Sequence, residues 1–321
     1  MTSAPGPALP PGRLALPSEV PPTRIRWDLA FAIALIHTLA LAAFAPYFFS
    51  WAGIIALIVG VHLFGQGINI GYHRLLTHRS FQTPWWVERT LVWLALCCRE
   101  GSPAGWVATH RFHHNNSDEQ EDPHSPLVAF LWGHIGWILV RNPRTQNIEM
   151  YHKYARDLLR NPYYMRLEKG WGMVHVYLLH AALFFAGGAL IPALGGAALA
   201  ECLRMGLSLV VWGVLVRTVV VWHITWSVNS LSHLFGYRSY DTGENSRNNW
   251  LVALLTVGEG WHNNHHHDPA SASVQHKWWE IDISYYQIRL LERLGLAWKV
   301  VRPRSRRHAE RDSRRGLSDA A

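Results

Sequence analysis

Four apolar stretches, each long enough to cross a lipid bilayer as a helix, are the strongest constraint on how this chain folds. They cover roughly residues 28–48, 51–71, 173–199 and 205–228. A helix needs about 20 apolar residues to span the hydrocarbon core of a membrane. Only 16% of the residues are charged, against about 25% in an ordinary soluble domain. We therefore predict an all-α integral membrane protein with four transmembrane helices.

Basic residues predict the orientation of these helices. Arg24 and Arg26 precede the first stretch, and Arg74 and Arg79 follow the second, whereas the connector between the two stretches has no Lys or Arg. Because basic residues favour the cytoplasmic side, we expect both termini and the long polar region before the third stretch to be cytoplasmic, in a bacterial inner membrane. Two apolar runs in that region, 84–98 and 127–140, look too short to span and are expected at the membrane interface.

Two tails flank the predicted membrane domain, which we place at residues 26–300. Residues 1–25 are rich in Pro, Ala and Gly and lack the apolar core of a signal peptide, so we predict a disordered tail. Residues 301–321 are predicted to form a second, basic disordered tail. The net charge of +8 favours membrane lipid as a partner over nucleic acid, because no nucleic-acid-binding motif is present.

Histidines recur in short motifs just beyond the ends of the second and fourth stretches and in the polar region between the second and third. In the two HxxHH motifs, residues i, i+3 and i+4 share one face of a helix, so three imidazoles can converge. Neutral imidazole is a strong ligand for iron, zinc or copper, and nine such histidines suit two metal ions better than one. The nine histidines and one nearby asparagine are His73, His78, His110, His113, His114, Asn229, His233, His262, His265 and His266.

These segments resemble the membrane-bound fatty acid desaturases, specifically the acyl-CoA delta-9 (stearoyl-CoA desaturase-like) branch. That family carries HxxxxH, HxxHH, N-S-x-x-H and a second HxxHH motif. The corresponding segments here are "HRLLTH", "HRFHH", "NSLSH" and "HNNHH". The surrounding "GEGWHNNHH", "FGYRSYDTGENSRNNW" and "EDPHSP" are also similar to this branch, and the resemblance covers roughly residues 28–300.

The resemblance implies a cytoplasmic helical cap in which the nine histidines bind two ferrous ions and Asn229 reaches one iron through water. It implies an O2-dependent desaturase that introduces a cis double bond, at delta-9, into a saturated acyl chain carried by acyl-CoA. No catalytic residue is expected beyond the metal ligands. The chain has no haem, iron–sulfur or nucleotide-binding signature. Electrons must therefore come from a separate donor, a ferredoxin or cytochrome b5 with its reductase.

The second apolar stretch predicts where the acyl chain lies. Val61, Gly65, Asn69 and His73 recur every four residues, so they share roughly one helix face. If that face lines an acyl tunnel, Val61 and Gly65 are near its floor; the alternative is that these small residues serve helix packing. Glu100, Trp106 and Trp226, which lie near the metal motifs in the sequence, are added to this set. The predicted tunnel residues are Val61, Gly65, Asn69, Glu100, Trp106 and Trp226.

Three departures from the family pattern are visible in the sequence. Ala108 and Thr109 stand where vertebrate members carry an Arg-Asp pair linked with the thioester head group, so acyl-ACP or an intact lipid stays open as the carrier. Glu100 takes a place where the family usually has Gln. Arg217 lies inside the fourth stretch, where an ionisable group normally has a partner, and the sequence does not identify that partner.

Other functions are compatible with parts of this pattern. A related membrane di-iron hydroxylase or alkane monooxygenase is the nearest, although the N-S-x-x-H motif and four rather than six spans favour a desaturase. A membrane metal transporter or zinc-dependent sensor is more distant, because its ligands should lie within the bilayer. A soluble-type carboxylate di-iron enzyme is also disfavoured: "EDPH" and "EGWH" match Glu-x-x-His, but their Pro and Gly do not suit helix interiors.

Overall fold

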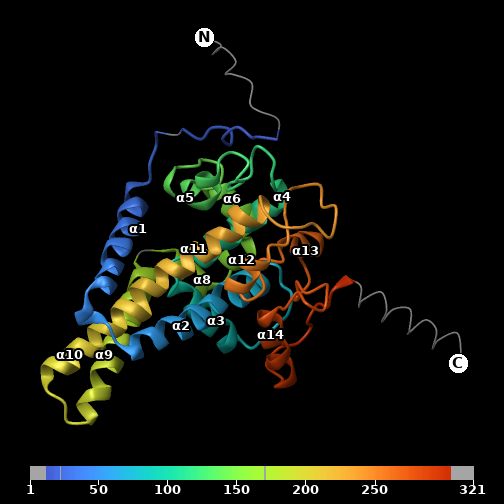
Figure 1. Cartoon of the computed structure of the whole chain (residues 1–321). Coiled ribbons are helices and arrows are strands. Elements are labelled where there is room, and N and C mark those ends of the chain that lie inside the picture. The colour runs from blue at the N-terminus through green and yellow to red at the C-terminus, as the bar shows by residue number, and fades with distance from the viewer. Residues whose placement is uncertain (1–11, 22, 170, 305–321) are drawn as a thin grey trace, which may run out of the picture.

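The computed structural model describes residues 12–21, 23–169 and 171–304. Within these ranges the secondary structure is helical, with isolated β-bridges and no strand. Long helices run out from a cap of shorter helices and loops, which lies at one end of the molecule (Figure 1). This arrangement confirms the predicted all-α architecture.

Four helical segments of the described chain are long and apolar enough to cross a membrane, as the sequence predicts. The first joins α1 (Trp27–Ala40) to the 3₁₀ turn η1 (Leu41–Phe44), and a second 3₁₀ turn, η2 (Pro46–Phe48), leads to the next span. The second span joins α2 (Trp51–Gln66) to the π-helix η3 (Gly67–Thr77). The third and fourth spans consist of α9 (Gly172–Leu194), then α10 (Leu199–Val210), η5 (Val211–Val216), α11 (Arg217–Ser230) and η6 (Leu231–His233).

The third and fourth spans form a tight antiparallel hairpin. A Cβ atom on Gly188 would lie 2.8 Å from the Met205 carbonyl oxygen, and one on Gly206 would lie 2.8 Å from the Phe185 carbonyl oxygen. Small residues at such contacts let transmembrane helices approach closely. The hairpin of α9 and α10 projects at the end of the molecule opposite the cap (Figure 1).

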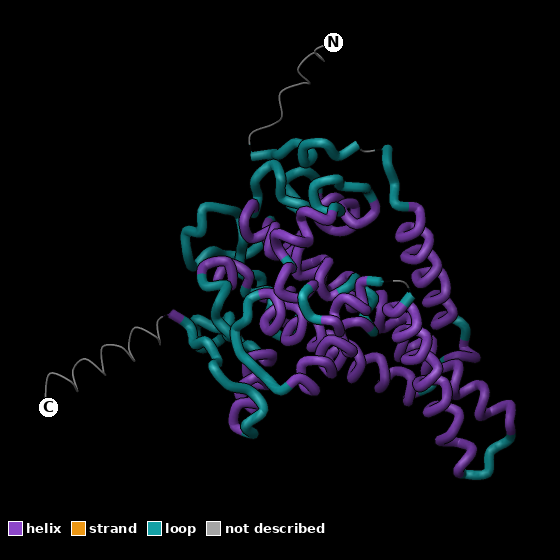
Figure 2. Tube along the Cα trace, turned by 180° about the vertical axis from the view of Figure 1, so that it is seen from behind, coloured by secondary structure: helices purple, strands orange, loops and turns teal. Residues whose placement is uncertain are grey.

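The cap is built from short helices and loops that follow the second and fourth spans (Figure 2). The two apolar runs expected to be too short to span form α3 (Trp85–Leu96) and the pair η4 (Trp132–Gly136) and α5 (Trp137–Leu139). α3 packs directly on η3, where a Cβ atom on Gly67 would lie 2.2 Å from the Ala95 nitrogen. The remaining cap helices are α4 (Pro103–Asn116), α6 (Ile148–Tyr154), α7 (Arg156–Leu159), α8 (Pro162–Glu168), α12 (Trp250–Leu255), α13 (His262–His267) and α14 (Ile283–Arg293).

The described part of the N-terminal segment lies along the cap. The Leu14 amide donates to the Leu127 carbonyl at 3.2 Å, and the Arg26 amide donates to the Leu139 carbonyl at 2.7 Å. The Ser18 hydroxyl donates to Glu121 Oε1 at 2.5 Å. Parts of the two predicted tails, residues 1–11, 22 and 305–321, lie outside the described residues.

Arg217, whose partner the sequence left open, is fully buried in the fourth span. Its guanidinium donates to the Cys97 carbonyl at 2.8 Å and to His180 Nε2 at 3.1 Å, and it lies 4.4 Å from the centre of the Phe64 ring. A charge inside a membrane span is stabilised by such polar and aromatic partners. Arg217 therefore ties the fourth span to α9, to α2 and to the end of α3.

Candidate metal centre

The nine histidines of the sequence motifs lie together where the spans meet the cap, in two adjoining groups. In each group, one ring nitrogen from every residue lies within 4.8 Å of the others. The groups touch each other, since the ring centres of His114 and His266 are 4.6 Å apart. The first group is His73, His78, His110, His114 and His265, and the second is His113, His233, His262 and His266.

Each HxxHH motif contributes to both groups. On α4, His110 and His114 point to the first group and His113 to the second; on α13, His265 joins the first group, while His262 and His266 join the second. The Ser102 side chain starts α4 by accepting a hydrogen bond from the Gly105 amide, with Pro103 in the first turn. The helical spacing predicted from the motifs is therefore what positions these six imidazoles.

A π-helix brings the HxxxxH pair together. Five residues in an α-helix turn by about 500°, which leaves i and i+5 on different faces. In η3, the His78 amide instead donates to the His73 carbonyl at 3.1 Å, the i+5 bond of a π-helix, and the two rings lie 4.8 Å apart. Such π-turns are rare and occur frequently at functional sites. The sequence indicated the pair but gave no sign of the π-turn.

Ring nitrogens of different histidines lie close to one another, and hydrogen bonds within the protein do not give every one of them a partner. The Nε2 atoms of His114 and His265 are 2.9 Å apart, and those of His233 and His262 are 3.1 Å apart. His113 Nε2 is buried with no hydrogen-bond partner. Burial also lowers the pKa of His114 to about 3, so the ring is neutral at pH 7. Imidazoles whose ring nitrogens converge in this way form, in their neutral state, a donor set that fits a first-row transition metal.

Carboxylates hold the outer nitrogens of three of these histidines. Nδ1 of His73 donates to Glu259 at 2.8 Å. The same contact joins His113 to Asp122 at 2.9 Å and His233 to Asp118 at 2.8 Å. Each contact fixes the tautomer that leaves Nε2 free to face the group, which is the usual way a metal-ligating histidine is oriented.

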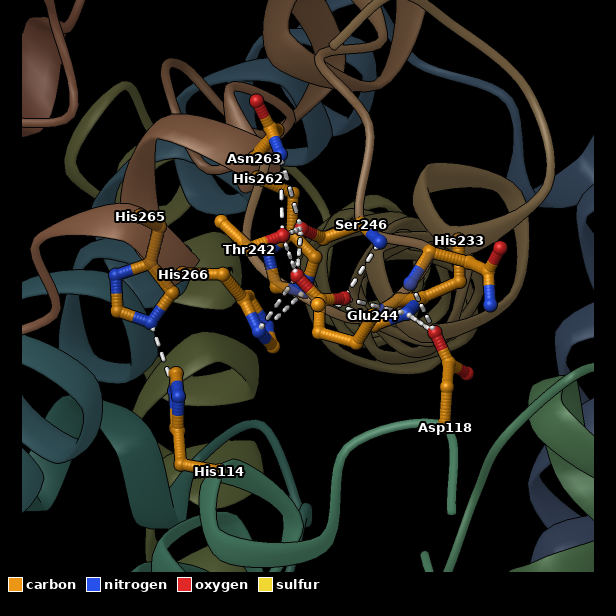
Figure 3. A network of polar contacts seen from close by, with 12 residues as sticks. His114, Asp118, His233, Thr242, Glu244, Ser246, His262, Asn263, His265 and His266 are labelled. Carbon is orange, nitrogen blue, oxygen red and sulfur yellow. Dashed lines mark hydrogen bonds and ion pairs between the residues drawn. The ribbon is translucent and has the colours of Figure 1, made fainter. Parts of the chain in front are cut away.

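A loop that links the fourth span to α12 brings a further carboxylate to the second group. Figure 3 shows Asp118 and Glu244 beside His233, with His266 next to Glu244. Glu244 lies 3.7 Å from Nδ1 of both histidines. Asn263 on α13 secures this loop by accepting from the Ser239 amide at 2.7 Å. The "FGYRSYDTGENSRNNW" segment therefore serves the second group from outside.

The pKa values of the buried acids differ with their partners. Burial alone would raise the pKa of Glu259, but the charge of Arg74 and the hydrogen bonds from Arg74 and His73 outweigh it and hold the pKa at about 2. Burial would likewise raise the pKa of Asp118, but His233 holds it at about 2. Burial raises the pKa of Asp122 to about 7, because its backbone hydrogen bonds offset the burial only in part. Two of the three carboxylates are therefore firmly anionic beside the histidines.

Sequence reasoning missed these acids and one further histidine. "EDPH" and "EGWH" were considered only as Glu-x-x-His ligand pairs, whereas Asp122 and Glu259 bind the outer nitrogens of histidines from other motifs. His124 is buried, with its ring centre 4.3 Å from that of His113. Their closeness in the sequence to the HxxHH motifs was the signal that could have identified them. His267, which follows the second HxxHH motif, stacks on Tyr240 and belongs to neither group.

A cavity of about 1060 Å³ runs from the histidines to the molecular surface. His73, His110 and His262 line one end, and Arg24 and Arg141 line another part. Ala108 is fully buried outside the lining, whereas Thr109 is part of it. Asn229 and all of the predicted tunnel residues line the cavity, namely Val61, Gly65, Asn69, Glu100, Trp106 and Trp226.

Three of these lining residues have defined interactions in the cavity wall. Asn69 donates to the Thr256 carbonyl at 2.8 Å, and Trp106 stacks on His110 with ring centres 4.9 Å apart. Burial raises the pKa of Glu100 to about 8, although hydrogen bonds from Thr225 and Trp106 partly oppose this. At pH 7 the Glu100 carboxyl is therefore mostly uncharged, which suits an apolar ligand.

These features define a helical membrane protein with a site for metal ions beside a large cavity. The chain matches the family model for fatty acid desaturase over residues 48–302, and it belongs to that family. The resemblance predicted from the histidine motifs is therefore confirmed, and the protein is a desaturase, an oxidoreductase that acts on fatty acyl chains.

Its relatives differ in the acyl carrier. The chain is 42% identical over 278 residues to an sn-1 stearoyl-lipid 9-desaturase of Anabaena variabilis, which covers 86% of this chain and 94% of the relative. It is 42% identical over 281 residues to an sn-2 palmitoyl-lipid 9-desaturase of Nostoc sp. (strain 36), with 87% and 91% covered. It is 40% identical over 269 residues to an acyl-CoA 5-desaturase of Anemone leveillei, with 84% and 77% covered.

Proposed function

We propose that this desaturase introduces a cis double bond at delta-9 of a saturated acyl chain, with O2 as co-substrate and two ferrous ions as cofactor. The observation that carries the proposal is the convergence of nine imidazoles, in two groups, at one end of a cavity that opens to the surface. The names of two relatives, both 9-desaturases, support the position of the bond.

The two groups would each hold one iron, with Asn229 reaching one of them through water. Iron bound there would supply, with O2, the oxidising power that removes hydrogen from an unactivated methylene pair, which no side chain can do. The protein's own residues orient the metal ligands and enclose the acyl chain. Glu259, Asp118 and Asp122 fix the imidazoles, and the cavity wall holds two adjacent methylenes beside them while excluding water.

Electron balance requires a further partner. Removing two hydrogen atoms from the substrate while O2 becomes two water molecules consumes two electrons and two protons from outside. The sequence has no motif for a redox cofactor that could store them. We therefore propose a separate donor, a ferredoxin or a cytochrome b5 with its reductase. It would reach the cap from the cytoplasm, in keeping with the proposed cytoplasmic location of both termini in a bacterial inner membrane.

Two carriers for the acyl chain have support. Acyl-CoA is the first, because four arginines line the cavity and suit phosphate groups, and one relative is an acyl-CoA desaturase. The second is an intact lipid, favoured by the stearoyl-lipid and palmitoyl-lipid relatives. Ala108 and Thr109, which replace the Arg-Asp pair, also favour it. The arginines are Arg24, Arg26, Arg99 and Arg141.

Reconstitution with product mapping tests the proposed reaction. Purified protein in vesicles is given iron, O2, ferredoxin, its reductase and NADPH, with stearoyl-CoA in one arm and distearoyl phosphatidylglycerol in the other. We expect an oleoyl product with the double bond at delta-9 in at least one arm. A hydroxylated chain would favour the related membrane hydroxylases, and turnover without any donor protein would contradict the proposed electron route.

A further inference from the structure

α1 forms one side wall of the cavity and packs little against the rest of the protein. Leu29, Ala32, Ile33 and Ile36 recur at spacings of three or four residues and line the cavity. No residue of α1 is buried. The opposite face, which includes Leu35, is apolar and exposed. α1 therefore separates the cavity from the surrounding bilayer as a single layer.

α2 lies on another side of the same cavity, and one of its residues there is both part of the wall and exposed. Ile58 lines the cavity, yet 64% of its surface is exposed. Ile58 is in the second membrane span, Trp51–Thr77. Both views of the chain show α1 and α2 diverging from their connection near the α9–α10 hairpin (Figures 1 and 2). A residue of the cavity wall is thus largely exposed within the span, where the surrounding medium is lipid.

The other edge of α1 is fastened by a chain of histidines. Nε2 of His37 lies 3.2 Å from Nε2 of His223, and Nδ1 of His223 lies 3.0 Å from Nε2 of His134. Nδ1 of His134 lies 3.0 Å from the hydroxyl oxygen of Ser230. His37 Nδ1 donates to the Ile33 carbonyl at 2.8 Å, so its Nε2 is free to accept. This chain ties α1 to α11 and η4, which leaves the edge beside α2 as the open one.

Cations line the cavity near the start of α1. Arg24, Arg26 and Arg141 belong to the lining, and the Arg141 amide donates to the Arg24 carbonyl at 2.8 Å. Trp27 follows directly and is exposed, as tryptophans are at a membrane–water interface. An apolar slot within the span, with arginines at its interfacial end, matches the shape and charge of a phospholipid: acyl chain inside, phosphate at the surface.

We propose that the acyl chain enters sideways from the bilayer through the opening between α1 and α2, while the arginines hold its lipid phosphate. The substrate class is therefore acyl chains still esterified in anionic membrane phospholipid. This inference rests on the proposed desaturation and chooses between its two carriers. A water-soluble carrier approaching from the cap has no need of an opening at the depth of Ile58.

Photolabelling tests the route without requiring turnover. The full-length protein is reconstituted in phosphatidylglycerol vesicles that contain a phosphatidylglycerol with a diazirine at mid-chain, and labelled residues are located by mass spectrometry. We expect label on the inner-face residues Ala32 and Ile36 as well as on outer-face residues. Label confined to the outer face would overturn the proposal. Inner-face labelling by a protein that desaturates no carrier would sustain the route and contradict the proposed function instead.

Matched tryptophan variants test the route during turnover. Ile36→Trp narrows the opening from α1, whereas Leu35→Trp adds the same ring on the exposed face of that helix. We expect Ile36→Trp to lower the rate on vesicle phospholipid by about tenfold relative to Leu35→Trp, to keep its iron, and to lose inner-face labelling. Equal rates for the two variants would overturn the proposal. So would an equal loss on stearoyl-CoA and phospholipid, because the ring would then block the tunnel itself.

Discussion

At the scale of single residues, imidazole–carboxylate contacts decide which nitrogen each histidine presents to its group. Glu259 is the clearest case, because it accepts from His73 Nδ1 at 2.8 Å and from Arg74 Nη2 at 2.7 Å while almost fully buried. The arginine keeps the carboxylate ionised, and the carboxylate keeps the imidazole in the tautomer with a free Nε2.

We expect Glu259→Gln to weaken metal binding by about 10–100-fold, because the amide binds His73 less strongly than a carboxylate does. The measurement is iron retained during competition with a chelator. Glu292→Gln is the control, since Glu292 pairs with Arg302 away from the histidines. Equal retention in both variants would show that Glu259 serves folding alone.

His113→Ala removes one imidazole from the second group only. We expect desaturation to be lost and bound iron to fall from about two to about one ion per chain, because the first group keeps its full donor set. Elemental analysis of the purified protein measures this. His152→Ala, an exposed histidine on α6, should keep both iron and activity. Full activity in the His113 variant would contradict the assignment of His113 as a metal ligand.

Burial raises the pKa of Glu100 from about 4.5 to about 8, which predicts a pH-dependent stability. The folded protein keeps this proton while the unfolded chain loses it, so stability falls as pH rises between these two values. Glu100→Gln removes this dependence. We expect the gain in thermal midpoint of the variant over the wild type to be larger at pH 8 than at pH 5. The same gain at both pH values would contradict the raised pKa.

At the scale of elements, the sequence predicts well whatever depends on local spacing. The apolar stretches became spans, and the HxxHH motifs became the faces of α4 and α13. The π-turn of η3 was not predictable, because His73 and His78 reveal their spacing but not the backbone that closes it. Contacts such as His37 with His223, 186 residues apart, depend on how helices dock and leave no local pattern.

The lining face of α2 predicts control of chain length. Val61 lines the cavity, whereas Val59 is exposed on the same helix. If Val61 is near the tunnel floor, Val61→Trp shortens the space beyond the reacting carbons. We expect activity on 18-carbon chains to fall by about tenfold relative to 14-carbon chains, and no such change for Val59→Trp. An unaltered chain-length profile in a folded, iron-loaded Val61→Trp protein would place the tunnel elsewhere.

At the scale of the whole molecule, exposed cations of the cap suggest where a protein partner docks. Lys153, Arg156 and Arg160 are exposed on or beside α6 and α7. α7 is linked to the metal centre through Asp157, which pairs with Arg79 at 2.5 Å and with Arg111 at 2.9 Å. These two arginines directly follow His78 and His110 in the chain. These three exposed cations are therefore connected to the first histidine group through Asp157, and we propose this part of the cap as the docking place of an acidic electron donor.

Charge reversal on this surface tests the docking of the donor. We expect Arg156→Glu combined with Arg160→Glu to raise the KM for an acidic ferredoxin by at least about tenfold, because complementary charge governs encounter. The KM for the acyl substrate and the iron content should stay unchanged. In the wild type, added salt should raise the KM for ferredoxin, because it screens the same charges. Arg293→Glu combined with Lys299→Glu makes the same change of charge at exposed positions in and after α14. Equal KM values for the two double variants would mean that the donor approaches another face.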